Sequence, residues 1–150
     1  MSVDVLTQIE IVRPRAEVAA FAADPTNATR WYRNIEAVTW ETSPPLAVGS
    51  RVRFRARFLG RTLEYTYEVV EFAPLERLVQ GMTDGPFAME TTYQWSDAPD
   101  GTLMTLRNRG EPEGYLRMLG GVVAAAMRRA NRADLARLKD LLEAEERREG

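Results

Sequence analysis

Tyrosine, arginine and aspartate are the side chains on which any chemistry in this sequence would depend, because the chain contains no histidine and no cysteine. Without these two residue types the protein lacks the usual general base, the commonest metal ligand and every thiolate nucleophile. The sequence also shows no glycine-rich phosphate loop, nucleophile elbow or metal-binding cluster. We therefore expect no metal and no cofactor, and the sequence assigns no catalytic residue. A reaction would have to use these side chains or bound water, with a cavity steering the substrate.

The segment between residues 51 and 69 predicts a hairpin that gathers aromatic side chains on one surface. Residues 51–58 alternate arginine with apolar residues, residues 63–69 alternate apolar residues with threonine and glutamate, and Leu59-Gly60 forms the turn. A two-residue turn fixes the register of the strands on either side of it. The cross-strand pairs are then Phe54 with Tyr65, Val52 with Tyr67, Ala56 with Leu63, Arg55 with Glu64 and Arg51 with Glu68. One face is apolar and aromatic, and the other is a ladder of opposite charges.

Other segments repeat this alternation or show helical spacing. Strands are predicted at 3–12, 35–41, 77–82, 87–96 and 102–109. Short helices are predicted at 15–23 and 26–32, separated by Asp24-Pro25, because a residue before proline avoids the helical conformation. From Glu113 to about Glu146 the apolar residues follow a helical stripe without proline. An interruption is expected near Gly120-Gly121, since one unbroken helix of that length would be longer than the domain is wide.

These elements predict an α+β fold, with one curved antiparallel sheet of about seven strands and two short helices after the first strand. A sheet of this size has to curl, and its single apolar face needs a cover. The C-terminal helix is the one long amphipathic element in the pattern, so the sheet is expected to wrap around it. We treat residues 1–150 as a single domain.

Several short segments resemble one known superfamily. They are 13–18 (RPRAEV), Asp24-Pro25, Trp31, Gly49, 58–61 (FLGR), Gly101-Thr102 and 135–143 (LARLKDLLE). From about Val3 to Glu146 the chain resembles the SRPBCC superfamily, also called START-like or Bet v 1-like, and it is most similar to the polyketide cyclase/dehydrase-like branch. The resemblance implies the helix-grip fold and a pocket between sheet and helix. Members bind lipids, sterols, polyketides, plant hormones or quinones, and some are cyclases, so no single reaction is implied.

The predicted ligand-binding residues lie on the concave sheet face, the terminal helix and the second short helix. They are Phe54, Tyr65, Tyr67, Tyr93, Trp95, Asn108, Asn131 and Trp31. Alternation places Met89, Thr91, Met104 and Leu106 on the same sheet face. Mostly apolar walls with a few polar groups are typical of ligand pockets. The alternative is a filled core in which each tyrosine hydroxyl has a local partner.

Asn131 is the sharpest polar signal in the terminal helix. It falls within the apolar stripe, one turn after Met127. If it is buried, the amide needs a hydrogen-bond partner, either a ligand or a strand residue such as Tyr67 or Asn108. The alternative is a position at the edge of the helix face. Asp134 is expected at the margin of the same helix face.

The loop at residues 83–86 (TDGP), together with Trp31 and Tyr32, is a candidate gate to the pocket, since glycine and proline can set a movable turn. The alternative is an ordinary surface loop beside an aromatic plug. Arg30 and Arg33 lie close by in sequence and would either pair with an acidic ligand or be solvated.

The charge balance argues against large anionic partners. The chain has 20 basic and 22 acidic residues, a net charge of −2, so it offers no global field for nucleic acid. The hairpin arginines face glutamates, and we expect no nucleic-acid binding. No apolar run is long enough to span a bilayer, and the first residues do not resemble a signal peptide. We expect a cytoplasmic protein without membrane insertion, and a homodimer through a sheet edge or the terminal helix is an open alternative.

Three functions are compatible with these observations. The leading hypothesis is a non-catalytic binder or carrier of a hydrophobic or aromatic small molecule, lipid-like or polyketide-like. The second is a polyketide cyclase, aromatase or dehydratase, which rests on the resemblance alone. The third is a protein-interaction module, which would need an exposed apolar patch larger than a few hundred Å². A cavity of roughly 300 Å³ or more would support small-molecule binding.

Overall fold

Alternating apolar residues form one seven-stranded antiparallel sheet in the computed structural model, which describes residues 3–84, 88–111, 115–118 and 120–149. The strands are β1 (Val3–Ile11), β2 (Ile35–Trp40), β3 (Arg51–Phe58), β4 (Arg61–Ala73), β5 (Arg77–Asp84), β6 (Ala88–Ala98) and β7 (Gly101–Glu111). Their order across the sheet is β1-β7-β6-β5-β4-β3-β2. Each strand from β2 to β6 therefore lies beside the next strand in the chain, while β1 pairs with β7 at the far edge.

Two groups of helices are attached to this sheet. Helix α1 (Arg15–Ala23), the 3₁₀ turn η1 (Pro25–Asn27) and α2 (Ala28–Trp31) follow β1, and α3 (Tyr115–Met118) and α4 (Gly120–Glu149) follow β7. The predicted second helix is thus split into two shorter turns. The Asp24 carboxylate accepts a hydrogen bond from the Thr26 N–H at 3.0 Å, and this cap starts η1.

Helix α4 confirms the predicted long terminal helix and runs beyond its predicted end. The interruption predicted near Gly120-Gly121 falls beside residue 119, which lies outside the described residues, as do residues 113 and 114 at the predicted helix start. No helix in the described part of the chain is long and apolar enough to cross a membrane.

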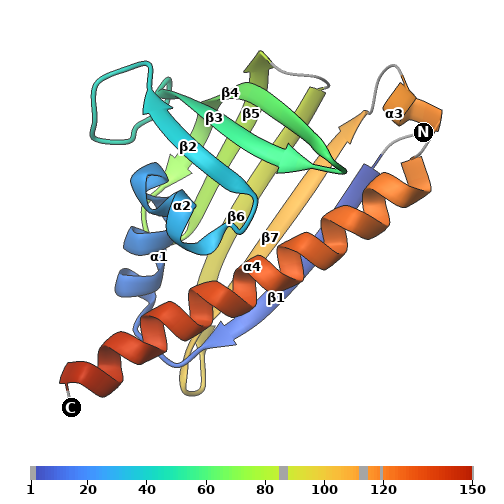
Figure 1. The fold of residues 1–150 in the computed structure, drawn as a ribbon. Helices are drawn as coiled ribbons and strands as arrows, with labels where there is room; N and C mark the ends of the chain where they lie inside the picture. The colour runs from blue at the N-terminus through green and yellow to red at the C-terminus, as the bar shows by residue number, and fades with distance from the viewer. Residues whose placement is uncertain (1–2, 85–87, 112–114, 119, 150) are drawn as a thin grey trace.

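Helix α4 is held along the concave side of the curved sheet. It packs along β1 and contacts α2. Figure 1 shows the helix crossing the sheet diagonally, with β2 and β3 curling over toward it and with α1 and α2 at its C-terminal half. The predicted arrangement, a sheet wrapped around a terminal helix, is therefore confirmed.

The β3–β4 hairpin has the predicted register. Phe54 pairs with Tyr65 and Val52 with Tyr67 across the ladder. The turn residues Leu59 and Gly60 both have positive φ, at 51° and 77°, as a two-residue turn of the primed type requires. Local turn geometry and side-chain alternation thus specify one and the same pairing.

The outer face of this hairpin carries the predicted charge ladder with one change. Glu64 pairs with Arg53 at 3.1 Å and with Arg55 at 3.5 Å. Arg51 lies opposite Glu68 in the register, but its ion pair at 3.9 Å is with Glu41, in the segment after β2. The partner differs because β2 pairs on the other side of β3 and brings Glu41 within reach.

The core has two ends with different packing. The packed end, formed where α1 and the C-terminal half of α4 meet the sheet, includes Ile11, Val18, Leu78, Trp95, Met104, Leu106, Leu135, Leu138 and Leu142. The open end has two smaller clusters, one of Val3, Val5, Met89, Val123 and Met127 and one of Ala28, Val52, Phe54 and Tyr67. The separation of these two clusters leaves space between them.

Candidate functional site

A cavity of about 120 Å³ lies at the open end, between the concave sheet face and α4. Strands β3 to β7, the α1–η1–α2 segment, the residues after α2 and α4 all contribute to its wall. Its apolar part includes Trp31, Phe54, Leu63, Tyr65, Met82, Met89 and Met127. The volume is below the roughly 300 Å³ that would support binding of a drug-sized molecule, because the aromatic side chains of β3 and β4 turn inward and occupy much of the concave surface.

Seven of the eight predicted ligand-binding residues line this cavity: Trp31, Phe54, Tyr65, Tyr67, Tyr93, Asn108 and Asn131. Trp95 does not, and its predicted position is wrong. It is 3% exposed and belongs to the packed end of the core. Met104 and Leu106 are likewise core residues away from the cavity, whereas Met89 and Thr91 line it. Alternation assigns these side chains to the correct face of the sheet, but not to a position along it.

The aromatic wall is built by the β3–β4 register. Phe54 and Tyr65, which are cross-strand partners, stack with ring centroids 5.6 Å apart. Tyr67 meets Tyr65 edge-on at 5.4 Å. Aromatic pairs in these geometries contribute roughly 0.5–1.5 kcal/mol each beyond burial, so the ring contacts stabilise this wall.

A chain of hydrogen bonds crosses the sheet beneath that wall. The Thr91 hydroxyl donates to Asn108 Oδ1 at 2.5 Å and lies 2.8 Å from the Tyr67 hydroxyl. Since the Thr91 proton is used toward Asn108, the Tyr67 hydroxyl is the donor in the second bond. Burial raises the pKa of Tyr67 to about 12, although the Thr91 bond acts in the opposite direction. Tyr67 therefore stays protonated as a donor at neutral pH.

A second tyrosine pair closes the side of the cavity next to α2. The Tyr32 and Tyr93 hydroxyl oxygens are 2.5 Å apart. Burial raises the pKa of both, and the neighbouring Tyr93 raises that of Tyr32 further. Tyr32 was expected only beside a gate, yet it lines the cavity because α2 ends at Trp31 and turns its next residue inward.

Asp134 lies in the cavity wall, although the helical pattern predicts it at the margin of its face. It is 2% exposed. Its Oδ1 accepts a hydrogen bond from the backbone N–H of Arg33 at 3.0 Å. Burial raises the pKa of this carboxyl to about 6, while the Arg33 N–H and guanidinium oppose the rise. The prediction was wrong because the segment after α2 crosses α4 and covers a position that the isolated helix would expose.

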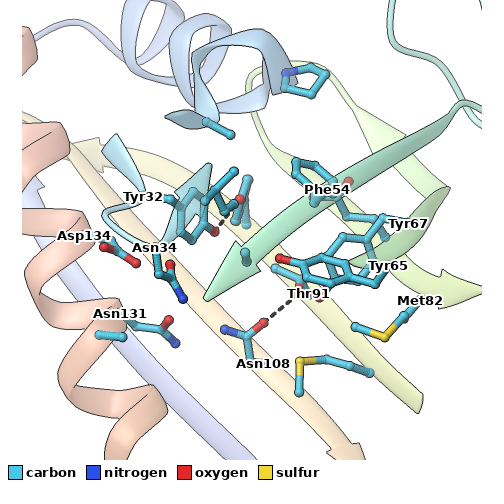
Figure 2. Close-up of a pocket in the computed structure, with 18 of the residues that line it drawn as sticks. Tyr32, Asn34, Phe54, Tyr65, Tyr67, Met82, Thr91, Asn108, Asn131 and Asp134 are labelled. Atoms are coloured by element: carbon cyan, nitrogen blue, oxygen red, sulfur yellow. Dashed lines mark hydrogen bonds between the residues drawn. The ribbon is translucent and has the colours of Figure 1, made fainter. Parts of the chain in front are cut away.

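Asn131 lies one helical turn from Asp134, and it is 5% exposed. Its side-chain nitrogen has no hydrogen-bond partner among the described residues. The expected packing bond to Tyr67 or Asn108 is not formed. Tyr67 bonds Thr91, and the Asn108 carbonyl is taken by the same threonine. Figure 2 shows Asn131 extending from α4 and Asn108 extending from β7 into the same part of the cavity.

Some lining residues carry no periodic signal in the sequence. Asn34 lies in the short turn between α2 and β2, and Leu46 in the loop before β3. A turn and a loop have no alternation from which a direction can be deduced. Of the predicted gate, Thr83 bonds the Thr66 carbonyl at 3.4 Å, and residues 85–86 lie outside the described residues.

An open groove of about 580 Å³ adjoins the cavity on the outer side of α4. The two hollows share Asn34, Ala130 and Asp134 in their walls. Arg33 and Arg129 flank the groove, and alanines of α4 form its floor. Because these three residues face both hollows, the wall between cavity and groove is one side chain thick there.

A curved antiparallel sheet gripping α4 around a partly open cavity defines a helix-grip domain of the SRPBCC superfamily. The family described as polyketide cyclase / dehydrase and lipid transport matches residues 2–143. The chain belongs to this family. No curated protein matches the chain by sequence.

Solved structures share this fold at low sequence identity. The protein TTHA0849 from Thermus thermophilus has a TM-score of 0.82 and 19% identity, with 94% of this chain and 97% of that chain covered. The Zhui aromatase/cyclase from Streptomyces sp. R1128 has a TM-score of 0.81 and 14% identity, with coverage of 95% and 94%. Ara h 8.0201 has a TM-score of 0.72 and 9% identity, with coverage of 96% and 99%. At these identities the likeness concerns the fold alone.

Proposed function

We propose that this protein binds a small, mostly apolar molecule, or the ring of a larger lipid-like or polyketide-like one, in the cavity between the sheet and α4. One observation carries the proposal, namely a partly open cavity in which an aromatic wall faces polar groups from α4 and β7. Such a combination, an apolar body with a few placed polar groups, is typical of ligand sites. The family match supports it, because the family description includes lipid transport.

The cavity size limits the ligand. An apolar cavity of roughly 150 Å³ takes up one benzene ring, and the cavity here has about 120 Å³. Sites for drug-sized molecules run from about 300 Å³ upward. A single aromatic ring therefore fits with little rearrangement, while a larger ligand has to extend into the neighbouring groove past Ala130 and Asp134.

Native mass spectrometry of the protein purified from its own host tests this proposal. We expect a copurifying apolar molecule, and in its absence uptake of ethylbenzene, which calorimetry can follow. Ala56→Leu adds three carbons at a buried lining position and should remove uptake. Ala136→Leu adds the same three carbons at an exposed position of α4 away from the cavity and should leave uptake intact. A wild-type protein that takes up no apolar molecule would contradict the proposal.

A second candidate function is cyclase-type or dehydratase-type catalysis, which Asp134 favours. A buried carboxyl with a pKa near 6 in a cavity wall has the properties of a general base or acid. Benzoylacetone, a 1,3-diketone, tests it through deuterium exchange at the carbon between its carbonyls. Asp134 would take that proton and return a deuteron. Asp134→Asn should abolish any acceleration over buffer, and Asp140→Asn, on the exposed side of α4, should not.

The remaining expectations stay predictions. We expect a cytoplasmic location and no nucleic-acid partner. A homodimer stays an open alternative to a monomer. The interaction-module alternative depends on a contiguous apolar surface. Among the residues whose side chains the structure describes, the large apolar ones more than half exposed are Leu6 of β1, Val48 of the loop before β3, Val70 of β4, Met118 of α3 and Val122 of α4.

A further inference from the structure

Three asparagine side chains from separate elements line the cavity together. Asn108 comes from β7, Asn131 from α4, and Asn34 from the turn between α2 and β2. Figure 2 shows the three amides on the side of the cavity next to α4, with the aromatic wall of Phe54 and Tyr65 across from them. The cavity therefore has a polar side and an apolar side.

The direction of the hydrogen-bond chain determines what Asn108 offers to this space. Thr91 donates its proton to Asn108 Oδ1, and that bond occupies the carbonyl end of the amide. The other end, the Nδ2 group with two N–H donors, points away from Thr91. In Figure 2 it points toward α4 and Asn131. Asn108 therefore presents donors to the cavity.

Asn131 presents donors as well. Its side chain is buried, and its Nδ2 has no partner among the described residues. A buried N–H group without a partner costs free energy, and a ligand that supplies an acceptor removes this cost. The unpaired N–H groups of Asn131 therefore favour a ligand that carries a hydrogen-bond acceptor.

Asp134 limits the charge of that acceptor. Its carboxyl lies in the same wall, one helical turn from Asn131, and its hydrogen bond comes from the Arg33 backbone. A second negative charge beside a buried carboxylate would be repelled. The acceptor that fits the amides is therefore uncharged.

We infer that the cavity recognises a neutral carbonyl oxygen carried on an apolar ring, with the amides of Asn131 and Asn108 as the donors. The inference rests on the proposed function, because it specifies the ligand class of the same site. An aromatic ketone or ester fulfils it, with the ring against Phe54 and Tyr65. A plain hydrocarbon leaves the Asn131 donors unpaired, and a carboxylate meets Asp134.

Isothermal titration calorimetry at pH 8 with four probes of one skeleton size tests the inference. The probes are acetophenone, ethylbenzene, 1-phenylethanol and benzoate. Acetophenone should bind the wild-type protein most tightly and benzoate most weakly. In Asn131→Leu, which has a similar shape but no donor, the preference for acetophenone over ethylbenzene should fall roughly tenfold, as expected for one lost hydrogen bond.

Ethylbenzene serves as the internal control for folding, because its binding to Asn131→Leu should be retained. Gln94→Leu likewise removes an amide, but on the exposed outer face of β6 away from the cavity, and should keep the wild-type preference. Unchanged preference in Asn131→Leu, or tightest binding of 1-phenylethanol, would overturn the inference while leaving the proposed function intact. Failure of all four probes to bind the wild-type protein would overturn both.

Discussion

At the scale of single residues, the surroundings of each carboxyl decide its behaviour. A hydrogen bond from Arg107 lowers the pKa of the exposed Asp4. Asp134 has a backbone N–H as its partner and is buried, so its pKa rises to about 6. The two aspartates therefore respond to acid in opposite ways. Asp4 loses a stabilising ion pair when protonated, whereas Asp134 is relieved of a buried charge.

The free energy of unfolding should depend on pH because folding raises the pKa of Asp134. The unfolded carboxyl loses its proton near 3.8 and the folded one near 6, so the folded state binds more protons in that interval. The contribution of the Asp134 carboxyl to the free energy of unfolding is fully present below pH 3.8. It is lost as the pH rises through 6. Two pKa units correspond to about 3 kcal/mol. The free energy of unfolding of Asp134→Asn minus that of wild type should therefore grow by about 3 kcal/mol between pH 3.5 and 7.

Urea unfolding at several pH values measures this difference. Taking the difference between variant and wild type removes the contributions of Asp4 and other unchanged groups. The matched variant Asp140→Asn, on the exposed side of the same helix, should show a difference that is flat with pH. A flat difference for Asp134→Asn as well would mean that its carboxyl is solvated in the folded protein.

At the scale of elements, the closing contact between β1 and β7 depends on a glycine. Gly101 begins β7, and a Cβ at this position would overlap the Ile11 carbonyl oxygen and lie 2.8 Å from the Arg13 nitrogen. The next residue, Thr102, donates its hydroxyl to the Arg13 carbonyl at 2.8 Å. The end of β1 and the start of β7 are thus pressed together where the chain leaves toward α1.

Gly101→Ala should destabilise the protein by about 3 kcal/mol, because the backbone atoms that it meets cannot move without opening this strand pair. Gly81→Ala in β5 is the control, since a Cβ there meets nothing within 4 Å. It should change stability by no more than about 0.5 kcal/mol. Denaturant midpoints measured in parallel compare the two, and equal midpoints would show that the β1–β7 contact is looser than described.

At the scale of the whole molecule, the two ends of the core have different roles. The packed end supplies stability, and the open end leaves a space that side chains do not fill. Helix α4 spans both, with Leu138 buried in the packed end and Met127 at the cavity wall. The same helix thus anchors the fold and lines the site.

Alanine substitutions of buried side chains on α4 should distinguish the packed end of the core from the open end. Leu138→Ala removes a fully buried side chain from dense packing and should cost about 3 kcal/mol. Met127→Ala removes a side chain that already borders empty space and should cost about 1 kcal/mol, because fewer contacts are lost. Thermal or urea unfolding measures both. Equal losses would indicate that the open end is packed as densely as the other.

The sequence by itself determined the elements and the faces they present. Two-residue alternation and the Leu59-Gly60 turn specify the β3–β4 register, since both depend on local geometry alone. The position of Asn131 within an apolar stripe identifies it as a buried amide, because helical periodicity is also local.

Only the tertiary structure decided where along the curved sheet the space remains. Trp95 and Tyr93 share a face and both belong to the cluster of the packed end, but only Tyr93 also reaches the cavity wall. Asp134 becomes buried only when the segment after α2 packs across α4. The cavity volume, the missing partner of Asn131 and the raised pKa of Asp134 all depend on contacts between residues distant in sequence, which periodicity does not encode.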